Sequence, residues 1–239
     1  MKMEIDKLYL GNCLGIMKEF PNECVDCIIT DSPFKLNYTS GSQTSSAKQD
    51  KWQGNLIAGD KTANIHNDIK FSDWLPDAFR IMKEGHFYSF VNDKNLHHFI
   101  NEAEKVGFLL HNILVWKKNN KTPNRWYMKN CEFIVFMRKG RAKPINNLNA
   151  SQLLECRNLS GKEKEHPTQK PIEILEMLIE NSTNESDIVL DMFMGSGSTC
   201  LASKLCNRKY VGIEIDEKHF STATNRIMNC AIGKKLKFN

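Results

Sequence analysis

Two short stretches combine residue types that could do chemistry, and each follows an apolar run. The first, Asp31-Ser32-Pro33-Phe34, sets an acid, a proline and an aromatic residue after Ile28-Ile29. A carboxylate beside a main-chain carbonyl held by the proline ring offers two rigid hydrogen-bond acceptors, and the aromatic ring offers a face for a planar group. Such a corner suits an NH₂ group on a heteroaromatic ring. An ordinary strand-to-turn transition is the alternative, because Asp, Ser and Pro are common turn residues.

The second stretch, Asp191–Thr199, contains Gly195 and Gly197 and follows the apolar run 188–190. This pattern predicts a buried strand, a tight turn and a helix that Ser198 or Thr199 caps. Glycines allow turn conformations closed to other residues and let a ligand lie against the main chain. Cofactors of open α/β sheets bind at this position, beyond the carboxyl end of a strand.

The glycine spacing limits which kinds of cofactor this turn could bind. The turn lacks the third glycine of a dinucleotide fingerprint, and no Gly-Lys-Ser/Thr follows, so a phosphate-gripping loop is disfavoured. The next strand pattern, 209–215, ends near Glu214, and an acid there suits a ribose with both hydroxyls free. The unit therefore favours a nucleoside-type cofactor, with a plain βαβ unit as the alternative.

Strand and helix patterns alternate along the chain, and they would bring these corners together. Apolar residues at helical spacing recur from Leu75, from Leu96, after Pro171 and after Asp216, where the last helix is capped. This alternation predicts an α/β fold with a mostly parallel sheet and helices on both faces. No clear helix separates the two strand patterns before residue 140, so we expect an antiparallel edge there. The seven strand patterns are 7–11, 25–30, 86–91, 112–117, 132–138, 187–193 and 210–215.

Composition fits one sizeable domain over residues 1–239. The chain is 41% hydrophobic and 26% charged, with a net charge of +5 that fits a polyanionic partner if it is clustered. It has neither an opening signal-peptide pattern nor a membrane-length apolar run, so we expect a cytoplasmic protein without membrane contact. Most of the eight cysteines lie in apolar runs and are read as free buried thiols; Cys24-x-x-Cys27 lacks a second pair, and we predict no metal site.

Two polar stretches interrupt the pattern. Residues 35–70 are expected to form a mobile loop near the acid-proline corner, since long irregular connections are usually functional or mobile. The second stretch, 119–165, overlaps a run from Lys117 to Lys143 with nine Lys or Arg residues against the single acid Glu132. Basic residues interleaved with aromatic ones suit a nucleic-acid backbone and unstacked bases, although a solvated basic face is the alternative.

Three motifs together resemble the DNA amino-methyltransferases, which methylate adenine N6 or cytosine N4. Asp31-Ser32-Pro33-Phe34 is similar to their (Asp/Asn/Ser)-Pro-Pro-(Tyr/Phe/Trp) signature, with Ser32 where proline is usual. The loop Asp191–Gly197 resembles their S-adenosylmethionine loop, with Met192 in place of its proline. The segment 166–171 resembles the element that precedes this loop, and the motif order is that of the family's β group. The resemblance implies a Rossmann-like methyltransferase fold with a mostly parallel seven-stranded sheet and one antiparallel strand.

The resemblance also implies roles for individual residues. Asp31 and the carbonyl of Ser32 or Pro33 would hold the amino group of a flipped base, and Phe34 would stack on it. Residues 119–165 would recognise the DNA target, with Lys121, Arg125, Trp126 and Lys129 as contact candidates. The pocket for S-adenosylmethionine would comprise Asn12, Cys13, Asp31, Thr168, Lys170, Pro171, Asp191, Phe193, Gly195, Gly197, Ser198 and Glu214.

The leading aspartate of the tetrapeptide favours adenine N6, because the family's cytosine-N4 members tend to begin it with serine. A cytosine-N4 enzyme, a methyltransferase acting on RNA, protein or a small molecule, and a non-catalytic DNA-binding relative are the alternatives. The expected partner is double-stranded DNA. A homodimer and a partner restriction endonuclease are both compatible with the resemblance.

Overall fold

The computed structural model describes residues 3–33, 69–122, 127–159 and 169–230. Contacts divide the chain into two compact units, Met1–Ser32 with Phe71–Asn239, and Pro33–Lys70. Every helix and strand that the structure describes belongs to the first unit. They are β1 (Lys7–Leu10), α1 (Cys13–Lys18), β2 (Cys27–Asp31), α3 (Phe71–Ile81), β3 (Gly85–Val91), α4 (Leu96–Lys105), β4 (Leu109–Thr122), β5 (Lys129–Lys139), β6 (Leu153–Glu155), α5 (Ile172–Ser182), β7 (Ile188–Asp191), α6 (Ser198–Leu205), β8 (Lys209–Glu214) and α7 (Glu217–Asn229).

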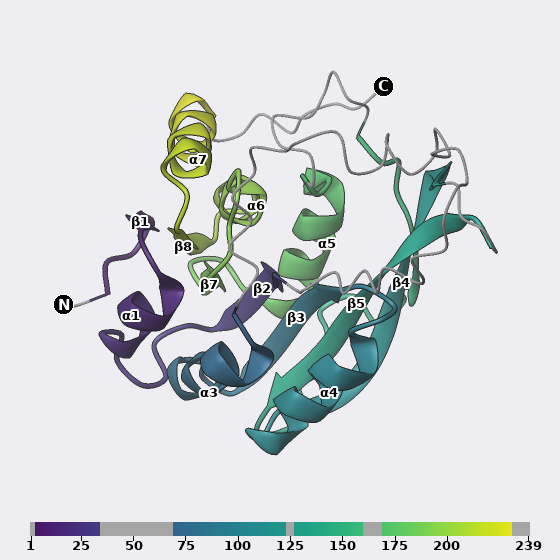
Figure 1. Ribbon diagram of the computed structural model, residues 1–239, viewed down its shortest axis with the longest axis horizontal. Coiled ribbons are helices and arrows are strands. Elements are labelled where there is room, and N and C mark those ends of the chain that lie inside the picture. Colours follow the sequence, from purple (N-terminus) through teal and green to yellow (C-terminus); the bar gives the residue numbers. More distant parts are fainter. Residues whose placement is uncertain (1–2, 34–68, 123–126, 160–168, 231–239) are drawn as a thin grey trace, which may run out of the picture. The chain divides into compact units, whose positions relative to one another are not determined.

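A single sheet of eight strands, in the order β1-β8-β7-β2-β3-β5-β4-β6, forms the centre of this unit (Figure 1). The strand β5 runs antiparallel to both of its neighbours, β3 and β4. The other pairings are parallel. The sheet is therefore mostly parallel with one antiparallel strand.

All seven predicted strands are present, but the sheet has eight, because the three-residue strand β6 pairs with β4. This addition also corrects the expected antiparallel edge. The antiparallel strand β5 lies inside the sheet, and β6 forms the edge beyond β4. The predicted helices after Leu75, Leu96, Pro171 and Asp216 are confirmed as α3, α4, α5 and α7.

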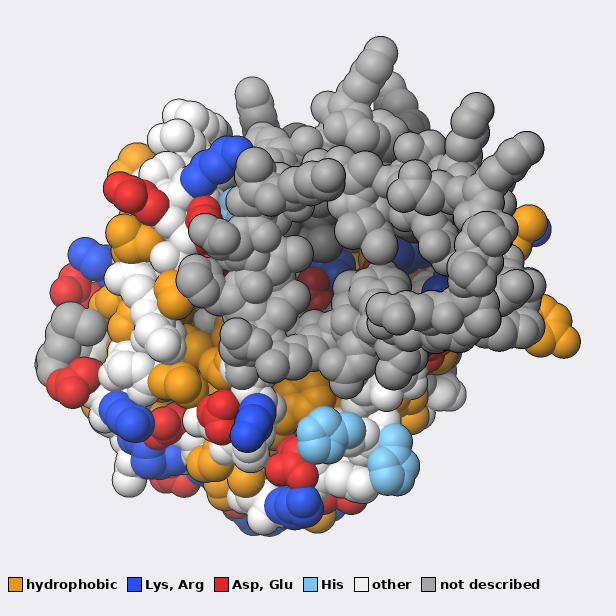
Figure 2. All heavy atoms as spheres, viewed as in Figure 1, with side chains coloured by type: hydrophobic (Ala, Val, Ile, Leu, Met, Phe, Trp, Pro, Cys, Tyr) orange, Lys and Arg blue, Asp and Glu red, His pale blue; other side chains and the backbone are white. Residues whose placement is uncertain are grey.

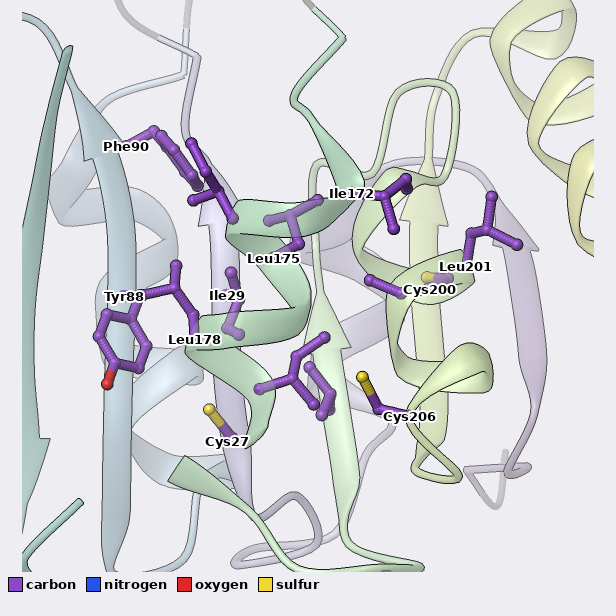
Figure 3. Close-up of a cluster of buried hydrophobic side chains, with 14 of the residues drawn as sticks. Cys27, Ile29, Tyr88, Phe90, Ile172, Leu175, Leu178, Cys200, Leu201 and Cys206 are labelled. Carbon is purple, nitrogen blue, oxygen red and sulfur yellow. The ribbon is translucent and has the colours of Figure 1, made fainter. Parts of the chain in front are cut away.

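Successive residues of a strand point to opposite faces of the sheet, so the apolar strands present side chains on both faces. Helices cover both of these faces. In β2, Ile29 joins a buried cluster with Tyr88 of β3, Leu175 and Leu178 of α5, and residues of α6 and α7 (Figure 3). An aromatic cluster is also buried in this unit: Trp74 of α3 and Phe99 of α4 lie against Phe87 of β3, which packs on Phe108. Figure 1 shows α1, α3 and α4 grouped apart from α5, α6 and α7.

The chain leaves two neighbouring strands in opposite directions. From β2 it continues to β3 on one side, whereas from β7 it passes through α6 to β8 on the other side. Ligands of open α/β sheets bind beyond the carboxyl ends of strands at such a switch point. The fold therefore places a candidate site between the ends of β2 and β7.

All eight cysteines are free, as predicted, and four of them are buried. Among the residues with described structure, no helix has both the length and the apolar character to cross a bilayer.

Candidate active site

The two motif corners meet at this switch point. Asp31 ends β2 and Asp191 ends β7, and the two parallel strands are neighbours in the sheet. A direct hydrogen bond joins the corners, because the Thr30 hydroxyl donates to Asp191 Oδ1 over 2.8 Å in the buried interior. The two corners are therefore in direct contact, although the bonded residues lie 161 positions apart in the sequence.

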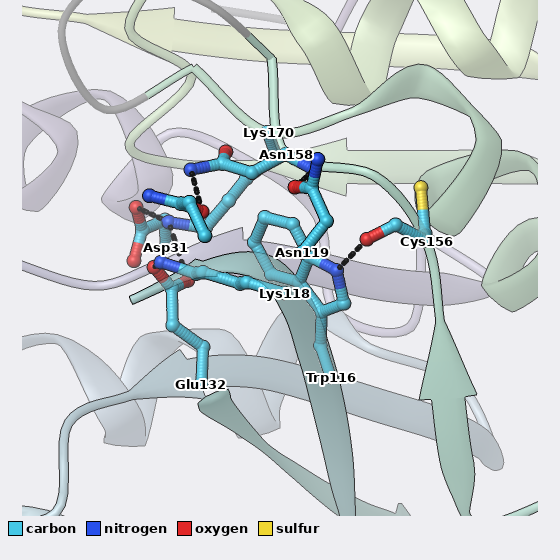
Figure 4. A network of polar contacts seen from close by, with 9 residues as sticks. Asp31, Trp116, Lys118, Asn119, Glu132, Cys156, Asn158 and Lys170 are labelled. Atoms are coloured by element: carbon cyan, nitrogen blue, oxygen red, sulfur yellow. Dashed lines mark hydrogen bonds and ion pairs between the residues drawn. The ribbon is translucent and has the colours of Figure 1, made fainter. Parts of the chain in front are cut away.

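Asp31 lies in a chain of alternating charges (Figure 4). Lys170 Nζ donates to Asp31 Oδ2 over 2.6 Å and lies 3.4 Å from Glu132 Oε2. Glu132 in turn accepts a hydrogen bond from Lys118 through its other oxygen. The Lys170 side chain is only 12% exposed, and its ammonium lies 4.9 Å from the centre of the Phe90 ring. A buried cation is thus held between two carboxylates and an aromatic face.

Burial and these neighbours set the protonation of the site. Burial raises the pKa of Asp31, and the attraction of Lys170 only partly opposes this effect. Burial disfavours the charged form of Lys170, but its two carboxylates outweigh burial, and the pKa of this ammonium is raised. Burial also disfavours the charge of Glu132, yet Lys170 and Lys118 lower its pKa. Lys170 and Glu132 are therefore held in their charged forms, whereas the surroundings of Asp31 favour its protonated form more than water does.

Ser32 stands where the family usually has proline, and its side chain has a structural partner. It is buried, and its hydroxyl accepts a hydrogen bond from Ser89 of β3 over 3.4 Å. Burying a hydroxyl without a partner is costly, so this contact makes the departure from the motif tolerable. The neighbouring motif residue Phe34 lies outside the described residues.

The two glycines of the turn have different surroundings. Gly195 adopts a φ of +52°, and a Cβ added there would meet none of the described atoms within 4 Å. Gly197 adopts a φ of +75°, but a Cβ there would lie 2.8 Å from the Cβ of Ala223 in α7. Gly195 can therefore leave room for a ligand, whereas Gly197 is required by the close packing of α7.

The start of α6 corrects the predicted cap. Gly197 is the N-cap residue, and no side chain caps the helix. Ser198 is instead the first helical residue, and its hydroxyl accepts a 3.2 Å hydrogen bond from Arg226 of α7. Thr199 hydrogen-bonds to Asp191. Burial raises the pKa of Asp191 to about 6, although the hydrogen bonds from Thr199, Thr30 and the Phe193 amide oppose this shift.

Arg226 is a structural contributor that sequence patterns did not reveal. It also donates to the carbonyl oxygen of Ser196 over 2.5 Å and to its hydroxyl over 3.0 Å. The guanidinium therefore connects α7 to three acceptors of the glycine turn. It lies 30 residues from Ser196 and belongs to no motif, so only the fold could bring the two together.

At the end of β8, Glu214 supports the same turn. Its Oε2 accepts from the Gly195 amide and its Oε1 from the Asp216 amide, each over 2.8 Å. Glu214 pairs in register with Leu10 of β1, which brings the start of α1 beside it. There Asn12 caps α1 by accepting from the Leu14 amide, and the Cys13 thiol is buried, which raises its pKa to about 12.

Two further residues predicted for the S-adenosylmethionine pocket lie on neighbouring parts of the fold. Phe193 contacts the buried Trp74 ring edge-on at 5.3 Å between centroids. Pro171 is the N-cap residue of α5, directly after Lys170. Thr168, the remaining pocket candidate, lies outside the described residues.

Much of the basic run is neutralised within the fold. Lys117 pairs with Glu155, Lys118 with Glu132 and Lys129 with Asp93. Over the described part of one face, Figure 2 shows basic and acidic side chains interspersed. Lys121 is exposed at the end of β4, and Arg125 and Trp126 lie outside the described residues.

The end of β4 is fastened to the segment that follows β6. The Trp116 indole donates to the Cys156 carbonyl over 2.9 Å, and Asn158 bonds to Asn119 and Asn120 (Figure 4). These contacts fix part of the stretch 119–165 next to the chain of charges around Asp31.

Comparison with known proteins gives consistent matches over nearly the whole chain. The family profile described as DNA methylase matches residues 25–225. The putative methylase YubD of Escherichia coli K12 is 32% identical, over 91% of this chain and 88% of its own. The type II methyltransferase M2.MboI of Moraxella bovis is 29% identical, over 87% and 82%.

Solved structures agree with this result. The complex of M1.HpyAVI with SAM superposes with a TM-score of 0.68 at 28% identity and covers 95% of this chain and 100% of that one. The cytosine-N4-specific PvuII DNA methyltransferase, at 17% identity, shares the fold with a TM-score of 0.70, covering 97% and 89%. With the motifs gathered at one switch point, these matches show that the chain belongs to the DNA methylase family, the S-adenosylmethionine-dependent amino-methyltransferases of the N6/N4 class.

Proposed function

We propose that this enzyme methylates N6 of a flipped adenine in double-stranded DNA. The observation that carries the proposal is the hydrogen-bonded junction of β2 and β7, where Asp31 ends one strand and Asp191, the first residue of the glycine motif, ends the other. This junction can bring a base amine held at one corner to a methyl donor held at the other. The leading aspartate of the tetrapeptide favours adenine, by resemblance to family members that act on that base.

The residues at the turn fit S-adenosylmethionine. Gly195 leaves space beside the main chain, whereas the Glu214 carboxylate, with one hydrogen bond on each oxygen, has lone pairs left for ribose hydroxyls. Asp191 is committed to Thr30, Thr199 and the Phe193 amide, so it holds the shape of the turn. When bound, S-adenosylmethionine supplies an activated methyl group.

The chemistry that remains for the protein is to make the amine nucleophilic. The lone pair of an exocyclic amine is delocalised into the ring. If Asp31 and the carbonyl of Ser32 or Pro33 accept its two N–H bonds, the nitrogen can pyramidalise and present its lone pair. This is catalysis by a preorganised acceptor pair. Because burial raises the pKa of Asp31, this carboxylate is also a better proton acceptor than an exposed aspartate.

The decisive test uses the purified protein, labelled S-adenosylmethionine and unmethylated duplex DNA. Digestion to nucleosides followed by mass spectrometry is expected to yield N6-methyladenine; N4-methylcytosine would overturn the choice of base. Asp31→Ala is expected to abolish methylation while calorimetry still detects binding of S-adenosylmethionine. Retained turnover in this variant would remove Asp31 from the mechanism.

A further inference from the structure

Lys170 binds the carboxylate of Asp31, which the proposed mechanism uses as a hydrogen-bond acceptor for the target amine. Its ammonium bonds Asp31 Oδ2 over 2.6 Å, while Glu132 Oε2 is 3.4 Å away on the other side. Asp31 Oδ1 can still accept an N–H bond. However, a carboxylate neutralised by an ammonium is a weaker acceptor for a nitrogen that gains positive charge during methyl transfer. The pair as it stands therefore opposes the step that Asp31 is proposed to assist.

Glu132 is placed to receive this ammonium. It lies on β5, pairs in register with Trp116 of β4, and is the single acid in the basic run of residues 117–143. Its Oε1 is bound by Lys118, whereas Oε2 faces Lys170. Two carboxylates and two ammonium groups give the chain Lys118–Glu132–Lys170–Asp31 no net charge, so moving Lys170 toward Glu132 only redistributes charge within it.

We propose that Glu132 is a positioning residue that draws the Lys170 ammonium away from Asp31 when the target amine arrives. This inference rests on the proposed function, because it assumes that Asp31 accepts the amine. The amine N–H then replaces the Lys170 N–H on Asp31, and Lys170 keeps a full ion pair with Glu132. Lys170 remains protonated throughout, and its position over Phe90 holds it within reach of both carboxylates.

The test compares Glu132→Gln with Glu102→Gln in the full chain. Glu102 also pairs with a lysine, Lys105, but on α4, so this control removes the same charge without touching the chain. A charge-assisted hydrogen bond is worth roughly tenfold or more in an equilibrium. We therefore expect Glu132→Gln to slow single-turnover methyl transfer about tenfold or more. Its dissociation constants for S-adenosylmethionine and DNA should stay within about twofold, and Glu102→Gln should match the wild type.

A double-mutant cycle tests whether Glu132 acts through Lys170. In a Lys170→Met background, Glu132→Gln is expected to cause no further loss of rate. An equal loss in both backgrounds, or an unchanged rate for Glu132→Gln alone, would overturn the inference. If Glu132→Gln does not fold, Glu132→Asp keeps the charge with a shorter reach and should slow methyl transfer at unchanged affinities. A wild-type rate of methyl transfer in Glu132→Asp would also overturn the inference.

A different result would refute the proposed function, in which Asp31 accepts the target amine. Turnover by Asp31→Ala would remove the acceptor role itself. An inactive Asp31→Ala together with a normal Glu132→Gln would refute only the role of Glu132.

Discussion

Alanine at Gly195 and at Gly197 should damage two different properties of the protein. Both glycines have positive φ, and both belong to the cofactor motif, so sequence reasoning gives them the same role. The structure separates them, because only at Gly197 would a side chain meet α7. Gly197→Ala should therefore lower stability, and Gly195→Ala should lower affinity for S-adenosylmethionine.

The magnitudes follow from the local geometry. A left-handed backbone costs a residue with a Cβ roughly 1–2 kcal/mol, and this applies at both positions. At Gly197 the new Cβ would also lie 2.8 Å from the Cβ of Ala223, and overpacking of this kind costs roughly 1–3 kcal/mol more. Gly197→Ala should then lose about 2–5 kcal/mol of a total near 5–15 kcal/mol. In a chain of this size, each kcal/mol corresponds to about 2–4 °C in Tm.

Scanning calorimetry and isothermal titration with S-adenosylmethionine measure the two properties separately. We expect Gly197→Ala to unfold at the lower temperature, and Gly195→Ala to bind the cofactor about tenfold more weakly or worse, since roughly 1.4 kcal/mol of steric conflict is tenfold. The opposite pattern would refute the reasoning. So would a Gly195→Ala variant with wild-type affinity, because its side chain would then be pointing away from the ligand.

Three further variants test other parts of the site. In Asp191, burial raises the pKa from 3.8 to about 6. Between these two pH values the folded state holds a proton that the unfolded state has lost, so stability falls as pH rises through this range. Asp191→Asn should remove about 3 kcal/mol of this pH dependence in denaturant titrations. Arg226→Met should lower both Tm and cofactor affinity, because it frees the carbonyl and hydroxyl of Ser196; a change in neither would show that the turn holds its shape alone. Lys121→Gln should weaken DNA binding and reduce its salt dependence by about one ion, while unchanged salt dependence in a filter-binding titration would exclude a phosphate contact.

Local patterns were sufficient to predict most of the fold. The apolar periods of α3 and α4 match the faces that these helices bury. The strand β6 was missed because three residues, Leu153–Glu155, are too few to show a period. Its pairing with β4 depends on tertiary contact, including the Trp116 indole bond to Cys156, rather than on local propensity.

The motif residues of the site were predicted, but their partners were not. Asp31 and Lys170 were each selected from a motif, yet nothing in the sequence indicates that they form an ion pair. In the sequence, Glu132 is only the single acid of a basic run, and Arg226 belongs to none of the motifs. Glu132 acts on Lys170, and Arg226 acts on Ser196 and Ser198, all at least 28 positions away, so their roles depend on strand order and helix packing.

The adjacency of β2 and β7 has a consequence for how such a catalyst can be encoded. The hydrogen bond from Thr30 to Asp191 joins two segments that lie 161 positions apart in the sequence. Geometry at the switch point demands only that the two strands be neighbours and point the same way. A rearranged gene that moved the methyl-donor half ahead of the base-holding half could rebuild the same junction, provided that its new loops were long enough.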